Sequence, residues 1–107
     1  MTLCGSTKFE KEYHYWNEHL TLQGHIVISL SVFPSNKPTR KWYSEETKKQ
    51  LDYIHLYKIS ISDAIFVIDC SLHNEAKTYI GESTKREIEF AKAIGKSIKY
   101  ASNMWSD

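Results

Sequence analysis

The chain has 107 residues, of which 41% are hydrophobic and 25% charged, and its formal net charge is +1. This length and composition predict one globular domain, residues 1–107, and argue against a disordered chain. With 14 basic and 13 acidic residues, the chain lacks the cationic excess typical of proteins that bind duplex nucleic acid.

The first half of the chain alternates between strand-like and helix-like patterns. Residues 1–4 predict a short strand. A first helix follows, because apolar residues recur at helical spacing at Phe9, Tyr13, Trp16 and Leu20, and Gly24 is expected to end it. Residues 25–33 are apolar and β-branched, which predicts a second strand. Residues 34–40 hold both prolines and predict a loop.

The second half continues the alternation. Ser44 can cap a second helix, which is amphipathic. Residues 64–69 form a continuous apolar run of the kind found in buried parallel strands. We expect a polar loop over 72–79, a third helix over 80–94 and a last strand over 97–100.

This order predicts an α/β fold, a small flavodoxin- or Rossmann-like three-layer sandwich with helices on both faces of a parallel sheet. We expect about four strands, numbered along the chain and ordered 2-1-3-4 in the sheet. Ligands bind such sheets beyond the carboxyl ends of the strands. The two loops at that edge begin at Gly5 and Asp69. The chain has no GxGxxG fingerprint and no P-loop.

Two segments place small, hydroxyl and cationic residues at the start of a helix, where backbone N–H groups and the helix dipole favour an anion. The same residue types are also ordinary helix caps. The candidate substrate- or phosphate-binding residues are Gly5, Ser6, Thr7, Lys8, Gly81, Ser83 and Thr84.

Two carboxylates lie where the pattern favours apolar residues. Glu87 falls near the middle of the apolar face of the third helix, and Asp63 directly precedes the strand over 64–69. Burying a carboxylate is costly unless it is paired or lies at a cleft. Glu87 is therefore either a salt-bridged residue at the helix edge or a carboxylate in a pocket. Asp63 is either a turn residue or a functional one.

The histidines and cysteines show no paired-ligand spacing and no CxxC, so we expect no metal site. We expect both cysteines to be reduced thiols. No apolar run approaches the ~20 residues that cross a bilayer, and the first residues do not resemble a signal peptide. These features predict a cytoplasmic protein that does not enter a membrane.

Three motifs, CGSTKF, SDAIFVID and GESTKREIEFAKAIGKSI, resemble the nucleoside 2-deoxyribosyltransferase-like superfamily. This group includes deoxyribosyltransferases and 2′-deoxynucleoside 5′-monophosphate N-glycosidases. The resemblance implies that Glu87 is a nucleophile and that Asp63 protonates or orients the leaving base. It also implies that Gly5 and Ser6 line the nucleotide site.

The implied ligand is a nucleoside or nucleotide, and the implied chemistry needs no cofactor. The first alternative is a non-catalytic nucleotide-binding or sensing module of the same fold, and the second is a small interaction subunit that binds no ligand. Members of the superfamily typically form dimers. The second helix and the Trp42–Tyr43 segment offer apolar surface beyond what one sheet needs, so we expect a homodimer or a higher even assembly.

Overall fold

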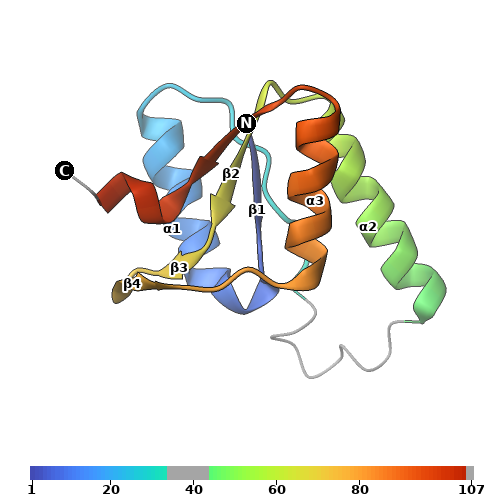
Figure 1. The fold of residues 1–107 in the computed structure, drawn as a ribbon, viewed down its shortest axis with the longest axis horizontal. Coiled ribbons are helices and arrows are strands. Elements are labelled where there is room, and N and C mark those ends of the chain that lie inside the picture. Colours follow the sequence, from blue (N-terminus) through green and yellow to red (C-terminus); the bar gives the residue numbers. More distant parts are fainter. Residues whose placement is uncertain (34–43, 106–107) are drawn as a thin grey trace.

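The computed structural model describes residues 1–33 and 44–105 (Figure 1). The side chains of residues 75, 76 and 105 are not described. The expected loop over 34–40 and the Trp42–Tyr43 segment therefore lie outside the described residues.

The fold is mixed α/β, and the described residues form a small parallel sheet and three α-helices. The strands of this sheet are β1 (Thr2–Gly5), β2 (Ala64–Ile68) and β5 (Ser97–Tyr100), in the order β1-β2-β5. Thr2 of β1 pairs with Ile65, and Ile65 pairs with Ile98 of β5. All five residues of β2 are buried, which confirms the buried central strand.

Three helices pack on this sheet. They are α1 (Glu10–Leu22), α2 (Glu45–Ser60) and α3 (Glu82–Ala93). The Oγ atom of Ser44 accepts a hydrogen bond from the Thr47 N–H at 3.0 Å, which confirms Ser44 as the cap of α2. After α3, Gly95 adopts a φ of +78°, a left-handed conformation that favours glycine at a helix end. Short 3₁₀ helices cover Thr7–Phe9 and Ala101–Trp105.

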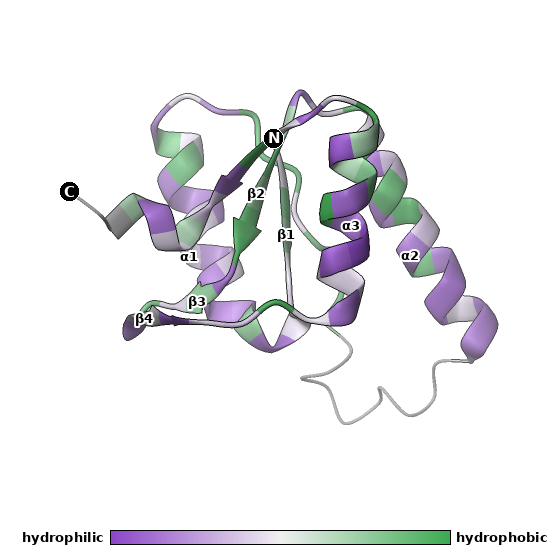
Figure 2. Ribbon diagram, viewed as in Figure 1, coloured by the Kyte–Doolittle hydropathy of each residue, from purple (hydrophilic) through white to green (hydrophobic). Residues whose placement is uncertain are grey.

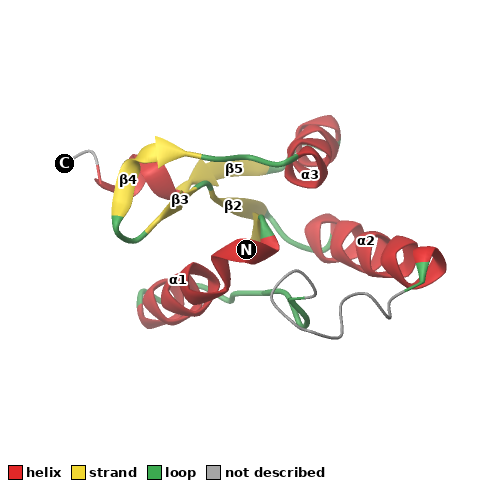
Figure 3. Cartoon of the chain, turned by 90° about the horizontal axis from the view of Figure 1, so that it is seen from below, coloured by secondary structure: helices red, strands yellow, loops and turns green. Residues whose placement is uncertain are grey.

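The helices cover both faces of the sheet. Figure 3 shows α1 on one side and α2 with α3 on the other. The side chains of β2 alternate accordingly. Phe66 and Ile68 join the apolar cluster under α1, whereas Ile65 and Val67 join the cluster under α2 and α3. In Figure 2 β2 is hydrophobic, while the helices are mixed and carry many hydrophilic residues, as expected for helices that bury one side.

The expected four-strand sheet in the order 2-1-3-4 is wrong. Residues 25–33 do not form a strand, and in the described part of this segment the β-pairing with the sheet is limited to a parallel bridge between Thr2 and Ile28. The Leu3 N–H donates to the Ile28 carbonyl at 2.9 Å, and the Ile28 N–H donates to the Met1 carbonyl at 2.9 Å. The chain then leaves the sheet, and Leu30, Ser31 and Val32 line a cleft instead. A β-branched sequence favours extended backbone, but a strand also needs backbone hydrogen bonds to a neighbouring strand.

The expected polar loop over 72–79 is also wrong. Strand β3 (Cys70–Ser71) pairs antiparallel with β4 (Asn74–Thr78), and they form a separate small sheet. A turn at Leu72–His73 joins the two strands. This hairpin projects beyond the carboxyl end of β2 (Figure 1). None of the helices in the described residues is both long enough and apolar enough to span a membrane.

Candidate functional site

A cleft of about 510 Å³ lies at the carboxyl end of β1, between the first loop, α2 and the start of α3. This volume falls within the roughly 300–1,000 Å³ range of small-molecule sites. Six of the seven residues expected to bind substrate line it, and so does Glu87. These residues come from two segments that lie far apart in the sequence: Gly5, Ser6 and Thr7 in one, and Gly81, Ser83, Thr84 and Glu87 in the other.

The first loop depends on Gly5. Its φ is +151°, and a Cβ atom there would lie 2.7 Å from the carbonyl oxygen of Ile68 in the neighbouring strand. Glycine therefore lets the backbones of β1 and β2 approach closely where the cleft begins. Ser6 follows as the cap of the 3₁₀ turn, where its side chain accepts a hydrogen bond from the Lys8 N–H. On the buried side, the Tyr13 hydroxyl donates to the Gly5 carbonyl at 2.8 Å.

The second loop opens α3 into the cleft. Gly81 is the N-cap, and no side chain caps this helix end by a hydrogen bond. A helix start without a side-chain cap presents backbone N–H groups and the positive end of the helix dipole. Ser83 and Thr84 belong to this first turn and line the cleft.

Two predicted site residues lie outside the cleft lining. Lys8 is exposed, and its Nζ atom lies 3.6 Å from the centre of the Tyr79 ring, in a cation–π contact. Asp63 lies at the amino end of β2, opposite the edge where the cleft is found. Its side chain is 93% exposed, and its nearest charge is the N-terminal amine at 3.8 Å. The structure therefore does not bring Asp63 to Glu87.

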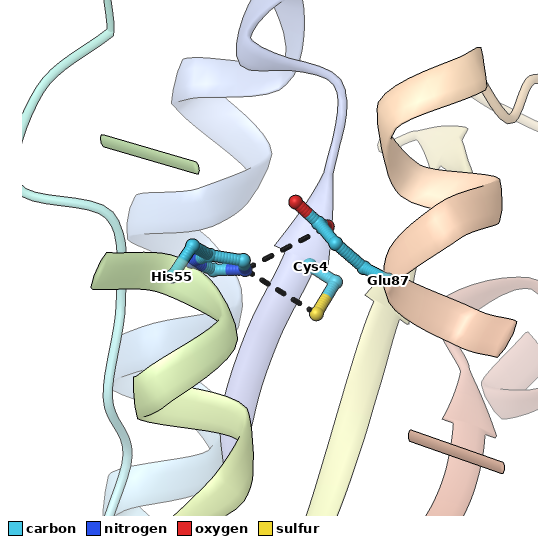
Figure 4. Close-up of side chains that lie close together, drawn as sticks. All are labelled: Cys4, His55 and Glu87. Atoms are coloured by element: carbon cyan, nitrogen blue, oxygen red, sulfur yellow. Dashed lines mark hydrogen bonds and ion pairs between the residues drawn. The ribbon is translucent and has the colours of Figure 1, made fainter. Parts of the chain in front are cut away.

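Glu87 meets two buried side chains that the sequence analysis did not select (Figure 4). His55 of α2 has Nε2 at 3.7 Å from Oε1 of Glu87 and at 3.4 Å from Sγ of Cys4 in β1. The Glu87 side chain is 15% exposed, and Cys4 is fully buried. His55 could have been found in the sequence, since it is a polar residue on the apolar face of α2, as Glu87 is on α3.

Burial dominates the electrostatics of this cluster. It raises the pKa of Glu87 to about 7, assisted by the negative charge of Asp52, while Cys4 and Arg86 act in the opposite direction. Burial also lowers the pKa of His55 to about 4, assisted by Lys58. The pKa of Cys4 is raised by burial and then by the charge of Glu87. At neutral pH the thiol and the imidazole are therefore neutral, whereas the Glu87 carboxyl is close to its own pKa and is present in both its protonated and its ionised form.

Among the described residues, the ligand atoms of Cys4, His55 and Glu87 lie within 4.8 Å of one another, a spacing that could hold a metal ion. However, a histidine that binds a metal usually donates its other ring N–H to a carboxylate or a carbonyl. Nδ1 of His55 is buried and has no hydrogen-bond partner among the described residues. The cluster therefore fits a hydrogen-bonded carboxylate better than a metal centre.

Two further acidic residues near the site have different roles. Asp69, at the end of β2, accepts hydrogen bonds from the backbone N–H and the hydroxyl of Ser102 at 2.9 and 2.7 Å. These bonds fix the C-terminal 3₁₀ turn. Asp52 of α2 is exposed and lines the cleft, and its charge acts on Glu87.

Comparisons with protein-family models, with curated proteins and with solved structures gave no match to this chain.

Proposed function

We propose that the protein cleaves the N-glycosidic bond of a nucleoside or nucleoside 5′-monophosphate, with Glu87 as the nucleophile. The observation that carries this proposal is a largely buried carboxylate in a cleft of about 510 Å³, beside a helix start without a side-chain cap. The resemblance to the nucleoside 2-deoxyribosyltransferase-like superfamily agrees with this reading, and membership in it is part of the proposal.

In this mechanism Glu87 attacks C1′ of the sugar, through a transition state with oxocarbenium character. A bond forms between the Glu87 carboxylate and C1′ as the bond from C1′ to the base nitrogen breaks. The base takes the electron pair of the broken bond and a proton from solvent, and the water that later attacks C1′ returns one proton to solvent. Water then attacks C1′ and releases Glu87, which gives a hydrolase. A second base in place of water gives a transferase.

Backbone N–H groups at the start of α3, with the hydroxyls of Ser6, Ser83 and Thr84, bind the sugar or a 5′-phosphate. Asp52 replaces Asp63 as the carboxylate that orients the leaving base, because Asp52 lines the cleft and Asp63 does not. The reaction needs no metal and no organic cofactor.

The test is incubation with a panel of nucleosides and 5′-monophosphates, with free base measured by chromatography. Glu87→Gln should abolish base release. Glu89→Gln, an exposed carboxylate on the same helix, is the matched control and should retain it. If the folded Glu87→Gln protein still releases base, Glu87 is not the nucleophile. If the wild type binds nucleotides but turns none of them over, the protein is the alternative, a non-catalytic binding module.

We also propose a homodimer formed through α2. Tyr53, Tyr57 and Ile61 are 72%, 60% and 60% exposed, and their spacing of four residues aligns them on one face. Light scattering should give twice the chain mass, and Tyr57→Glu should reduce it to one chain. A monomeric wild type at micromolar concentration would contradict the dimer. Cys4 and Cys70 form no disulfide, which agrees with a reducing, cytoplasmic location.

A further inference from the structure

Three side chains from separate elements meet beneath the cleft, and the mechanism above uses only one of them. Cys4 comes from β1, His55 from α2 and Glu87 from α3 (Figure 4). His55 is 4% exposed and Cys4 fully buried. Burying a histidine and a thiol beside a carboxylate is costly unless their polar atoms form hydrogen bonds.

The surroundings of His55 select its tautomer. Nε2 faces both Sγ of Cys4, at 3.4 Å, and Oε1 of Glu87, at 3.7 Å. Nδ1 is buried without a hydrogen-bond partner among the described residues. A proton on Nδ1 would leave a buried donor unpaired, which costs more than an unpaired acceptor. The proton therefore lies on Nε2, directed at the sulfur and the carboxylate.

The Cys4 thiol completes the arrangement. With Nε2 of His55 as the donor, the sulfur accepts, and its S–H group is left free to point at Glu87, a carboxylate oxygen of which lies within 4.8 Å of the sulfur. A donor in this position favours the ionised carboxylate. His55 and Cys4 thus form a chain of neutral donors that ends at Glu87. Neutral donors orient a carboxylate without forming a salt bridge that would weaken it as a nucleophile.

We propose that His55 and Cys4 are positioning residues, whose N–H and S–H groups hold the Glu87 carboxylate in its ionised, attacking orientation. The role given to His55 and Cys4 rests on the proposed function, whereas their positions beside Glu87 do not depend on it. Other titratable and charged groups also act on the cluster. Asp52 opposes ionisation of Glu87 and Arg86 favours it, while burial and then Lys58 lower the pKa of His55. The Tyr13 hydroxyl is neutral, because burial and then the charges of Cys4 and Glu87 raise its pKa.

The first experiment needs no substrate. Glutamate labelled with ¹³C at the carboxyl carbon is titrated by NMR, and the Glu87 resonance is identified by its loss in Glu87→Gln. Cys4→Ala should raise the titration midpoint of the Glu87 carboxyl by about one pH unit, because the ionised carboxylate loses one hydrogen-bond donor. Cys4→Ser keeps an O–H donor and should restore the midpoint. Cys70→Ala, at the other buried cysteine that forms no disulfide, is the matched control and should leave the midpoint unchanged.

The second experiment follows His55. His55→Leu should raise the same midpoint, while His55→Gln, which keeps an amide N–H near the position of Nε2, should reverse most of the shift. If the enzyme is active, a shift of about one unit lowers kcat/KM at pH 7 by about fivefold, because fewer molecules carry ionised Glu87. The lost activity should return in part at higher pH.

Midpoints that do not change in folded Cys4→Ala and His55→Leu proteins would overturn the proposal, whether or not base release is ever observed. One equivalent of zinc in the purified protein, removed by a chelator together with a change in the Glu87 resonance, would overturn it in favour of a metal site. If the midpoint of Glu87 shifts as predicted but the protein releases no base, the hydrogen-bonded cluster is supported and only the proposed function is contradicted.

Discussion

Replacing Glu87 with glutamine should stabilise the folded protein, and the gain should depend on pH. The side chain is 15% exposed, and burial with the nearby charge of Asp52 raises its pKa from 4.5 to about 7. The folded state therefore holds this proton more tightly than the unfolded state does. Glutamine has a similar shape and no charge to bury.

The sign follows from proton binding. Between pH 4.5 and 7 the unfolded chain has released the proton that the folded chain retains, so the free energy of unfolding falls as pH rises. Each pKa unit corresponds to about 1.4 kcal/mol, so a shift from 4.5 to about 7 corresponds to about 3 kcal/mol. The advantage of Glu87→Gln over the wild type should grow by up to this amount from pH 4 to pH 8.

Urea unfolding followed by circular dichroism at pH 4, 6 and 8 measures this difference. Glu89→Gln, on the exposed face of α3, is the control and should show no comparable trend. A difference between Glu87→Gln and the wild type that stays constant across this pH range would refute the claim that folding raises the pKa of Glu87. A difference that shrinks with rising pH would show that the site stabilises the carboxylate instead.

Three further changes test other parts of the site. The wild type should lose stability as pH falls from 6.5 to 4, because the folded protein resists protonating His55, whose pKa is lowered to about 4. His55→Leu should remove this loss, which urea midpoints measured against pH show. Asp52→Asn should lower the Glu87 midpoint in the ¹³C titration, because it removes a charge that raises that pKa; an unchanged midpoint would contradict this coupling. Gly5→Ala should cost roughly 2 kcal/mol or more and lower the melting temperature, because its Cβ would lie 2.7 Å from a backbone oxygen. Gly81→Ala, at a φ of −79°, should cost less.

The sequence by itself determined the elements whose signals are local. Helical spacing placed Tyr13, Trp16 and Leu20 on the buried face of α1, and all three are buried. The continuous apolar run over Ala64–Ile68 is the central strand. The helical wheel placed Glu87 among apolar residues, and it is partly buried there. Each of these predictions depends on the spacing of apolar residues within one helix or strand, and that spacing can be read from the sequence.

The strand pairings were decided only in three dimensions. The apolar segment over 25–33 has the composition of a strand, yet it makes a single bridge at Ile28 and then turns to line the cleft. The polar segment over 74–78 has little strand character, yet it pairs with β3. Ladder partners come from distant segments, so local preference cannot determine them.

The site shows the same division. Asp63 precedes β2, which places it at the amino edge of a parallel sheet, whereas the cleft lies at the carboxyl edge. Cys4, His55 and Glu87 meet because α2 and α3 pack on the same face as the Cys4 side chain. The sequence could indicate that Glu87 is unusual. Which groups surround it, and therefore its protonation, depends on how three separate elements pack.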